Sequence, residues 1–152
     1  MASNHFRDGH PVMVDVGDKQ PSTRVAVAEA RVRLPADAAA ALDGGAEKGD
    51  PLRVAELAGI MGSKRTSDLI PLCHPLPLDA THVTAARDGD AVVFTASCRT
   101  HARTGVEMEA LTAASVAALT LYDMLKGKSK GIVIEQVRLR SKEGGVSGRW
   151  SA

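Results

Sequence analysis

The chain has 152 residues, of which 44% are hydrophobic and 24% are charged, and its formal net charge is +1. This length is typical of one domain with one core, and the near-neutral charge excludes a strong overall attraction to nucleic acid or to anionic membranes. No stretch approaches the roughly 18 apolar residues that span a bilayer, and the polar N-terminus does not resemble a secretory signal. Two cysteines are too few for a disulfide framework, so we expect a cytoplasmic protein.

Taken in chain order, the residues predict a flexible arm and then a single domain. Residues 1–12 form the arm and residues 13–152 the domain. Over residues 24–34 apolar and polar side chains alternate, which predicts a half-buried strand. Pro35 then opens a short alanine-rich helix, and the glycine pair at 44 and 45 ends it.

A second helix and a strand pair follow. The helix begins with Asp50 as its N-cap and Pro51 at its first position, and it continues toward Lys64. After a proline-rich loop, strands at about 81–87 and 91–99 are joined by Asp-Gly-Asp, a hairpin signal. The second strand places alternate apolar residues on one face, so its cysteine is most simply a core residue: Val92, Phe94, Ala96 and Cys98.

Residues 105–126 predict the longest helix, because they contain no proline and no interior glycine. The expected buried stripe of this helix is Leu111, Ala114, Ala118, Leu121 and Leu125. A last strand covers residues 133–142. The order strand, helix pair, strand, strand, helix, strand predicts an α+β fold of the ferredoxin-like type, β-α-β-β-α-β, with helices packed on one face of an antiparallel sheet.

The most informative segment is GSKRTSDLIPLCHPLPL, residues 62–78. Three of the seven prolines lie between residues 71 and 77 and hold His74 in a stiff, non-helical loop, close after Lys64 and Arg65. A histidine in a packed core does not need a rigid backbone around it, whereas a histidine that binds a polyanionic ligand at a fixed distance does. Proline-rich connectors are ordinarily simple loops, and that alternative stays open.

The long helix carries acidic residues near both ends. At 100° per residue, Glu109 and Asp123 lie away from the apolar stripe and Glu107 lies close to it, so we do not expect the two glutamates to act as a pair in one pocket. Acids in a first turn also complement the helix dipole. Asp123 and Lys126 are neighbours, either as a proton-relay couple or as a solvated ion pair, which is the commoner case. Glu109 and Asp123 are ~21 Å apart along the axis, so a site that uses both ends requires two subunits.

Basic residues gather toward the end of the chain. Arg138, Arg140 and Lys142 alternate with other residues in the last strand, so we expect them to share one face. Lys48 lies in a glycine-rich loop before a helix N-terminus, where anions are favoured. Charged strand faces are usually exposed to solvent. Several cations together with a histidine in a stiff loop nevertheless favour the binding of a small phosphorylated ligand.

Other chemistries lack their motifs. The sequence contains no P-loop, dinucleotide fingerprint or GxSxG elbow. Adjacent Cys73 and His74 do not have the spacing of zinc or iron–sulfur ligands, so we expect no metal site. An aromatic content of 3% argues against an RNA-binding sheet of this topology.

Several long blocks resemble one enzyme family. They are MVDVGDK from Met13, KGD from Lys48, AGI through SKRTSDLIPLCHPLPL, GVEMEALTAASVAALTLYDMLK, and VRLRSKEGG with VSG. Together they cover about residues 13–148 and resemble the cyclic pyranopterin monophosphate synthases, the C proteins of molybdenum cofactor (molybdopterin) biosynthesis. This family converts a 3′,8-cyclised dihydroguanosine triphosphate into cyclic pyranopterin monophosphate and releases pyrophosphate, a phosphorus–oxygen lyase reaction. The resemblance implies a ferredoxin-like fold and a homohexamer, a trimer of dimers with active sites at the dimer contact.

The resemblance also implies roles for individual residues. Asp123 matches the catalytic aspartate of the family, and Lys126 matches its essential lysine. The positions that match the substrate pocket are Leu72, Cys73, His74, Met108, Glu109, Glu107, Lys48, Arg24 and Lys142, with Lys64 and Asp15 as further candidates. No cofactor is implied, and the sequence leaves open whether Mg²⁺ accompanies the triphosphate.

Two places depart from the family pattern. Val146 stands where the terminal GGKSG motif of the family has its lysine, so no cation is assigned there. Residues 127–130 read GKSK where relatives commonly have AVDK.

The chemistry of the substrate suggests a different role for each group of these residues. We expect Asp123 and Lys126 to exchange protons while the guanine-derived ring opens and closes as a pterin. Cations such as Lys48, Arg24 and Lys64 would neutralise the leaving pyrophosphate, and His74 either binds phosphate or donates a proton. The main alternative is a non-catalytic nucleotide-binding module of the same topology, and a purely structural oligomerisation domain is a third.

Overall fold

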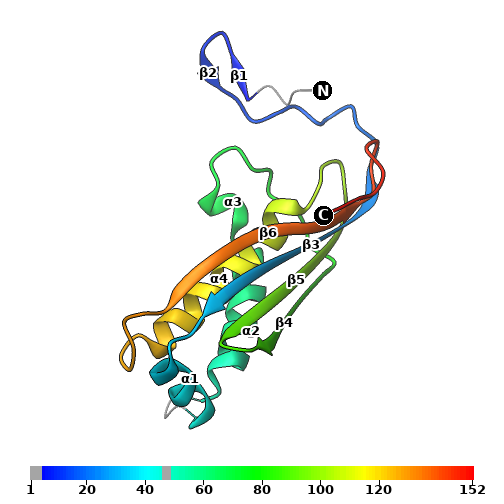
Figure 1. Cartoon of the computed structure of the whole chain (residues 1–152). Coiled ribbons are helices and arrows are strands. Elements are labelled where there is room, and N and C mark those ends of the chain that lie inside the picture. The colour runs from blue at the N-terminus through cyan, green and yellow to red at the C-terminus, as the bar shows by residue number, and fades with distance from the viewer. Residues whose placement is uncertain (1–4, 46–48) are drawn as a thin grey trace.

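The computed structural model describes residues 5–45 and 49–152, and its elements follow the predicted order (Figure 1). The elements are β1 (Phe6–Arg7), β2 (His10–Pro11), β3 (Ser22–Arg33), α1 (Ala36–Asp43), α2 (Pro51–Ser63), α3 (Thr66–Leu69), β4 (Ala80–Asp88), β5 (Ala91–Ala102), α4 (Glu107–Leu125), β6 (Val133–Glu143) and β7 (Trp150–Ser151). The hairpin β1–β2, the short helix α3 and the edge strand β7 were not predicted. The flexibility of the N-terminal arm stays a prediction.

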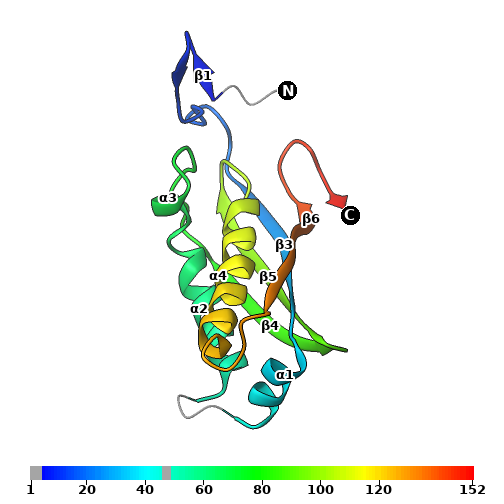
Figure 2. The same cartoon turned by 60° about the vertical axis from the view of Figure 1, so that its left-hand side comes forward.

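The main sheet has the strand order β4-β5-β3-β6-β7, and every neighbouring pair is antiparallel. Helices α2 and α4 pack together on one face of this sheet (Figure 2). Strand β3 lies in the middle of the sheet. After α2, the chain forms the hairpin β4–β5, and β5 pairs with one edge of β3. After α4, β6 pairs with the opposite edge of β3. This is the predicted ferredoxin-like topology, which is confirmed.

Local signals explain where several elements begin and end. The Asp50 side chain accepts a hydrogen bond from the Leu52 amide at 3.0 Å, so it caps α2 as predicted, with Pro51 at the first helical position. Gly44 follows the last residue of α1, and its amide donates to the Ala40 carbonyl at 2.9 Å, while the Gly45 amide donates to the Leu42 carbonyl. In the β4–β5 turn, Gly89 has φ +60°, a conformation that glycine adopts without a steric penalty.

The core consists mainly of small side chains between β3, β5 and α4. Phe94 is the largest fully buried side chain, and 12 of the 23 buried hydrophobic residues in the described part of the chain are alanines. The expected stripe of α4 is buried at four of its five positions, and only Leu111 is partly exposed. Because methyl groups occupy little space, α4 lies close to the sheet and its position is tightly defined.

A β-bulge in β6 overturns the prediction that three cations share one face. The pairing passes from Val27 opposite Ser141 to Ala28 opposite Leu139, so Arg140 is one extra residue in β6. One extra residue reverses the facing of every residue that follows it. Arg138 and Arg140 therefore contact Glu29 on the face away from the helices, whereas Lys142 pairs with the buried Ala26 and lies on the helix side.

Helix α4 is long and apolar enough by composition to cross a membrane, but half of its apolar window is buried inside the domain. Its residues form the core with β3 and β5. We therefore describe α4 as the core helix of a soluble α+β domain.

Two glycines of α2 allow it to lie against α4, and this contact generates a prediction. A Cβ at Gly59 would lie 2.8 Å from the Ala113 carbonyl oxygen, which is backbone and cannot move aside. We expect Gly59→Ala to lower the free energy of unfolding by about 1–3 kcal/mol, measured by urea denaturation. Gly127→Ala is the matched control, because a Cβ there meets no atom within 4 Å. Equal stability of the two variants would show that the helices can separate at no cost.

Candidate active site

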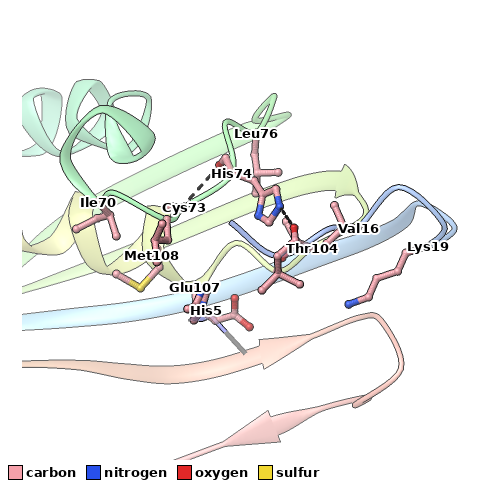
Figure 3. Close-up of a pocket in the computed structure, with 13 residues that line it drawn as sticks. His5, Val16, Lys19, Ile70, Cys73, His74, Leu76, Thr104, Glu107 and Met108 are labelled. Atoms are coloured by element: carbon pink, nitrogen blue, oxygen red, sulfur yellow. Dashed lines mark hydrogen bonds between the residues drawn. The ribbon is translucent and has the colours of Figure 1, made fainter. Parts of the chain in front are cut away.

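A cavity of about 450 Å³ lies at the N-terminal end of α4. The proline-rich loop after α3, the first turn of α4 and the N-terminal segment surround it (Figure 3). The loop contributes Ile70, Leu72, Cys73, His74 and Leu76, and the helix end contributes Thr104, Gly105, Glu107 and Met108. The structure thus brings together five residues that the sequence assigned to the substrate pocket: Leu72, Cys73, His74, Glu107 and Met108.

The loop is fixed to the sheet just after its prolines. The hydroxyl of Thr100, which is fully buried on β5, donates a hydrogen bond to the Pro77 carbonyl at 2.6 Å. The Asp79 amide donates to the Arg99 carbonyl at 2.8 Å and leads the chain into β4. Proline restricts the backbone between these points, so the loop presents its side chains at defined positions.

The hydrogen bonding of His74 determines which of its ring nitrogens a ligand can reach. Nε2 lies 2.6 Å from the carbonyl oxygen of Val14. A carbonyl oxygen can only accept, so Nε2 carries the hydrogen of this bond in both the neutral and the cationic ring. Nδ1 is therefore the nitrogen that can contact a ligand or exchange a proton.

Behind the cavity, Cys73 contacts a buried carboxylic acid. Its Sγ donates to Oε1 of Glu109 at 3.8 Å, a long contact even for sulfur, and Glu109 is only 3% exposed. The sequence placed Glu109 away from the apolar stripe of α4, and the structure shows that this side of the helix is buried as well. Helices α2 and α3 contact α4 in addition to the sheet, so α4 is covered on more than one side.

Burial controls the protonation of these two groups. It raises the pKa of Glu109, which favours the neutral acid. Burial, and next to it the charge of Glu109, raises the pKa of Cys73 to about 11. Cys73 is therefore a thiol near neutral pH and does not have the character of an activated nucleophile. The charge of Glu107, which lines the cavity, also raises the pKa of Cys73.

Cations gather beside Glu107 at the same end of the sheet. Lys142 lies on the helix side because of the bulge, and its Nζ is 3.1 Å from Oε1 of Glu107. Arg24 on β3 stands opposite Thr100, and its Nε is buried without a hydrogen-bond partner in the described part of the chain. The loop after β6 passes directly over this guanidinium, where a Cβ at Gly145 would overlap it.

Other predicted residues lie elsewhere. Asp123 and Lys126 form an ion pair of 2.7 Å at the far end of α4, with side chains 69% and 61% exposed. Since α4 is continuous, this pair is ~21 Å along the axis from Glu109. Lys64 ends α2 and is not among the described residues that line the cavity. Lys48 lies outside the described residues.

Asp15 shapes the N-terminal segment instead of lining the cavity. Its Oδ1 accepts a hydrogen bond from the Gly17 amide at 2.8 Å. Sequence reasoning missed four cavity residues around it, namely His5, Val14, Val16 and Lys19. The Asp-Gly pair at residues 8 and 9, a hairpin signal inside the predicted arm, was the available clue.

The amino-acid sequence of the chain is similar to those of known proteins. The sequence profile of the MoaC family matches residues 13–145. The chain belongs to this family. Cyclic pyranopterin monophosphate synthase of Rhodospirillum rubrum is 56% identical over 147 residues, which are 95% of this chain and 89% of the relative. The proteins of the same name from Deinococcus radiodurans and Dinoroseobacter shibae are 56% and 51% identical, over 97% of this chain and 89% and 96% of their own lengths.

The raised pKa of Glu109 predicts how stability depends on pH in this MoaC-family chain. Folding raises the pKa of the Glu109 carboxyl group above its value in the unfolded chain. Such a group stabilises the fold fully at pH values below the unfolded pKa, and this stabilisation is lost as the pH rises through the folded pKa. Glu109→Gln keeps the neutral shape at every pH. We therefore expect a higher Tm than wild type at about pH 8 but not at about pH 4, measured by calorimetry. Glu143→Gln, at an exposed position, controls for the loss of one carboxylate. A Tm gain that is the same at both pH values would contradict a raised pKa of Glu109 in the folded protein.

The thiol state of Cys73 predicts slow alkylation. With a pKa of about 11, its thiolate fraction near neutral pH is on the order of 100-fold below that of an ordinary cysteine. Iodoacetamide labelling of the Cys73 peptide, followed by mass spectrometry, should be slower by that order in the native protein than in the same protein in denaturant. Rapid native labelling at neutral pH would mean that a thiolate is present.

Proposed function

We propose that this chain is a cyclic pyranopterin monophosphate synthase, a lyase of molybdenum cofactor biosynthesis. It converts (8S)-3′,8-cyclo-7,8-dihydroguanosine 5′-triphosphate into cyclic pyranopterin monophosphate and releases pyrophosphate. The observation that carries the proposal is the high identity to synthases over nearly the whole chain, combined with the convergence of Leu72–His74 and Glu107–Met108 on one cavity.

The cavity supplies the contacts that this substrate requires. Leu72 and Met108 contribute apolar surface for the ring system, and Nδ1 of His74 is held ready for a polar group. Lys142 and Arg24, together with Lys48, provide positive charge for the phosphates and for the pyrophosphate that leaves when a hydroxyl attacks the α-phosphorus. Glu107 pairs with Lys142 and keeps its ammonium beside the cavity.

Proton transfer belongs to Asp123 and Lys126, which stand outside the cavity of their own chain. The hydrogen bond to Asp123 raises the pKa of Lys126, so the lysine starts as the acid of the couple. Ring opening and pterin formation need several proton transfers, and an adjacent carboxylate and ammonium can take and return them.

We further propose that two protomers form each active site, within a homohexamer built as a trimer of dimers. Leu119 lies one helical turn before Asp123 on the same face of α4, and it is 58% exposed. Leu57 and Met61 are also exposed, on the neighbouring helix α2. A partner that covers this apolar surface would bring its own cavity toward Asp123 and Lys126.

The proposed reaction needs no resident cofactor, and any Mg²⁺ arrives with the triphosphate. The substrate is a small nucleotide, and we propose neither a nucleic-acid nor a membrane partner. A soluble domain whose substrate derives from GTP fits a cytoplasmic location.

Turnover tests the function directly. Purified protein should release pyrophosphate from the cyclised triphosphate in stoichiometry with the pterin chromophore. Binding of the nucleotide without product would favour the non-catalytic module instead. Absence of both binding and product would favour a structural domain.

Subunit mixing tests the shared site. Asp123→Asn, Lys126→Ala and His74→Ala should each lower kcat by about 10²-fold or more without dissociating the assembly, checked by size exclusion. The His74→Ala and Asp123→Asn subunits are mixed, unfolded and refolded together. Half of the twofold dimers then contain one subunit of each kind, and one of the two sites in such a dimer has both intact residues. About one quarter of all sites should therefore be active. Activity that does not recover in mixed assemblies would place the complete site within one chain.

A further inference from the structure

The N-terminal segment forms one wall of the cavity. His5, Val14, Val16 and Lys19 line it together with the proline-rich loop. We call residues 5–19 the strap. In Figure 1 the strap runs from the hairpin β1–β2 across the end of the domain to β3, and in Figure 3 Val16 and Lys19 are seen beside His74 and Thr104.

The hairpin at the start of the strap is a defined structure. Asp8 and Gly9 both have positive φ, 53° and 80°, as in the type I′ turn that suits the twist of a two-residue hairpin. Arg7 stands opposite His10, and the Val12 amide donates to the His5 carbonyl at 2.8 Å. The turn thereby returns the chain so that His5 lies beside the residues that enter the cavity wall.

His5 brings an imidazole that no other part of the reaction scheme uses. Its Nδ1 is buried and has no hydrogen-bond partner among the described residues. A buried polar atom without a partner is unfavourable unless a ligand or water satisfies it. Because His5 lines the cavity, the substrate is the ligand in a position to do so.

The bond between His74 and Val14 connects the strap to the loop. An isolated two-stranded hairpin is at best marginally stable in water, so the strap depends on contacts with the rest of the domain. The 2.6 Å bond from Nε2 of His74 to the Val14 carbonyl joins the middle of the strap to the stiff loop. A single hydrogen bond at this point can open to admit a ligand and close again.

We propose that the strap closes the substrate pocket, that Nε2 of His74 holds it through Val14, and that His5 is a further substrate-binding residue. The inference rests on the proposed function for the identity of the ligand. His5 and Lys19 supply donors for anionic oxygens of the cyclised triphosphate, from the side of the cavity that faces the proline-rich loop. His74 has two separate tasks, with Nε2 on the strap and Nδ1 toward the ligand.

Substitution of the strap histidines tests the binding role. We expect His5→Ala to raise KM about tenfold, and His5→Asn, which keeps an amide nitrogen near the position of Nδ1, to recover part of the loss. His10→Ala is the matched control in the same hairpin, because His10 is exposed and outside the cavity lining, and its KM should equal that of wild type. A wild-type KM in His5→Ala, or an equal loss in His10→Ala, would overturn the binding role.

A second measurement needs no ligand and tests the latch, by which we mean the hydrogen bond from Nε2 of His74 to the Val14 carbonyl. Glutamine places its amide nitrogen near the position of Nε2, whereas asparagine places its amide near Nδ1. Hydrogen exchange of peptides that cover residues 5–19 should therefore accelerate in His74→Asn and stay close to wild type in His74→Gln. Turnover should fall in His74→Gln, which lacks Nδ1. Equal exchange in the two variants would overturn the latch.

The two measurements separate this inference from the proposed function. If the wild-type protein releases no pyrophosphate, the function is wrong, and the exchange experiment still decides whether His74 holds the strap. If the wild type is active and His5→Ala matches it, the function stands and the strap is not a binding element.

Discussion

The close packing of α4 on the alanine-rich face of the sheet is the constraint on which the rest of the molecule depends. Ala26, Ala28 and Ala30 of β3 are buried against a helix whose own buried face is largely alanine. Methyl groups leave little room to slide or rotate, because any shift would create voids or overlaps throughout the core. The first turn of α4 is therefore held at a fixed place, and Glu107, Met108 and the buried Glu109 are positioned by it.

The same rigidity keeps the two ends of α4 apart. Its first turn lies in the cavity, whereas Asp123 and Lys126 stand about 21 Å away along a helix that cannot bend toward it. Within one chain, the proposed proton-transfer couple and the proposed binding cavity are separate. A second protomer is the simplest way to unite them, and the exposed Leu119 on the face of Asp123 supplies apolar surface for that contact.

The cavity lies where the proline-rich loop and the strap meet. Thr100 anchors the proline-rich loop to β5, and Cys73 contacts Glu109 behind it, where burial raises the pKa of both groups. The strap is joined to the loop by the bond between His74 and Val14. The proline-rich loop keeps the His74 imidazole in place, and Nε2 of that imidazole contacts the strap at Val14.

The sequence by itself determined the order of strands and helices, the caps at Asp50 and Pro51, and the core face of Val92, Phe94, Ala96 and Cys98, because these depend on periodicity and turn chemistry over a few residues. The resemblance to the family selected the loop and helix residues that converge on the cavity. Only the tertiary structure decided the facing of Lys142, since the bulge at Arg140 appears in the pairing of β6 with β3, more than a hundred residues away. It also decided the burial of Glu109 and the place of His5 in the cavity wall. Burial and register are set by partners that are remote in the sequence, and no local pattern of side chains records them.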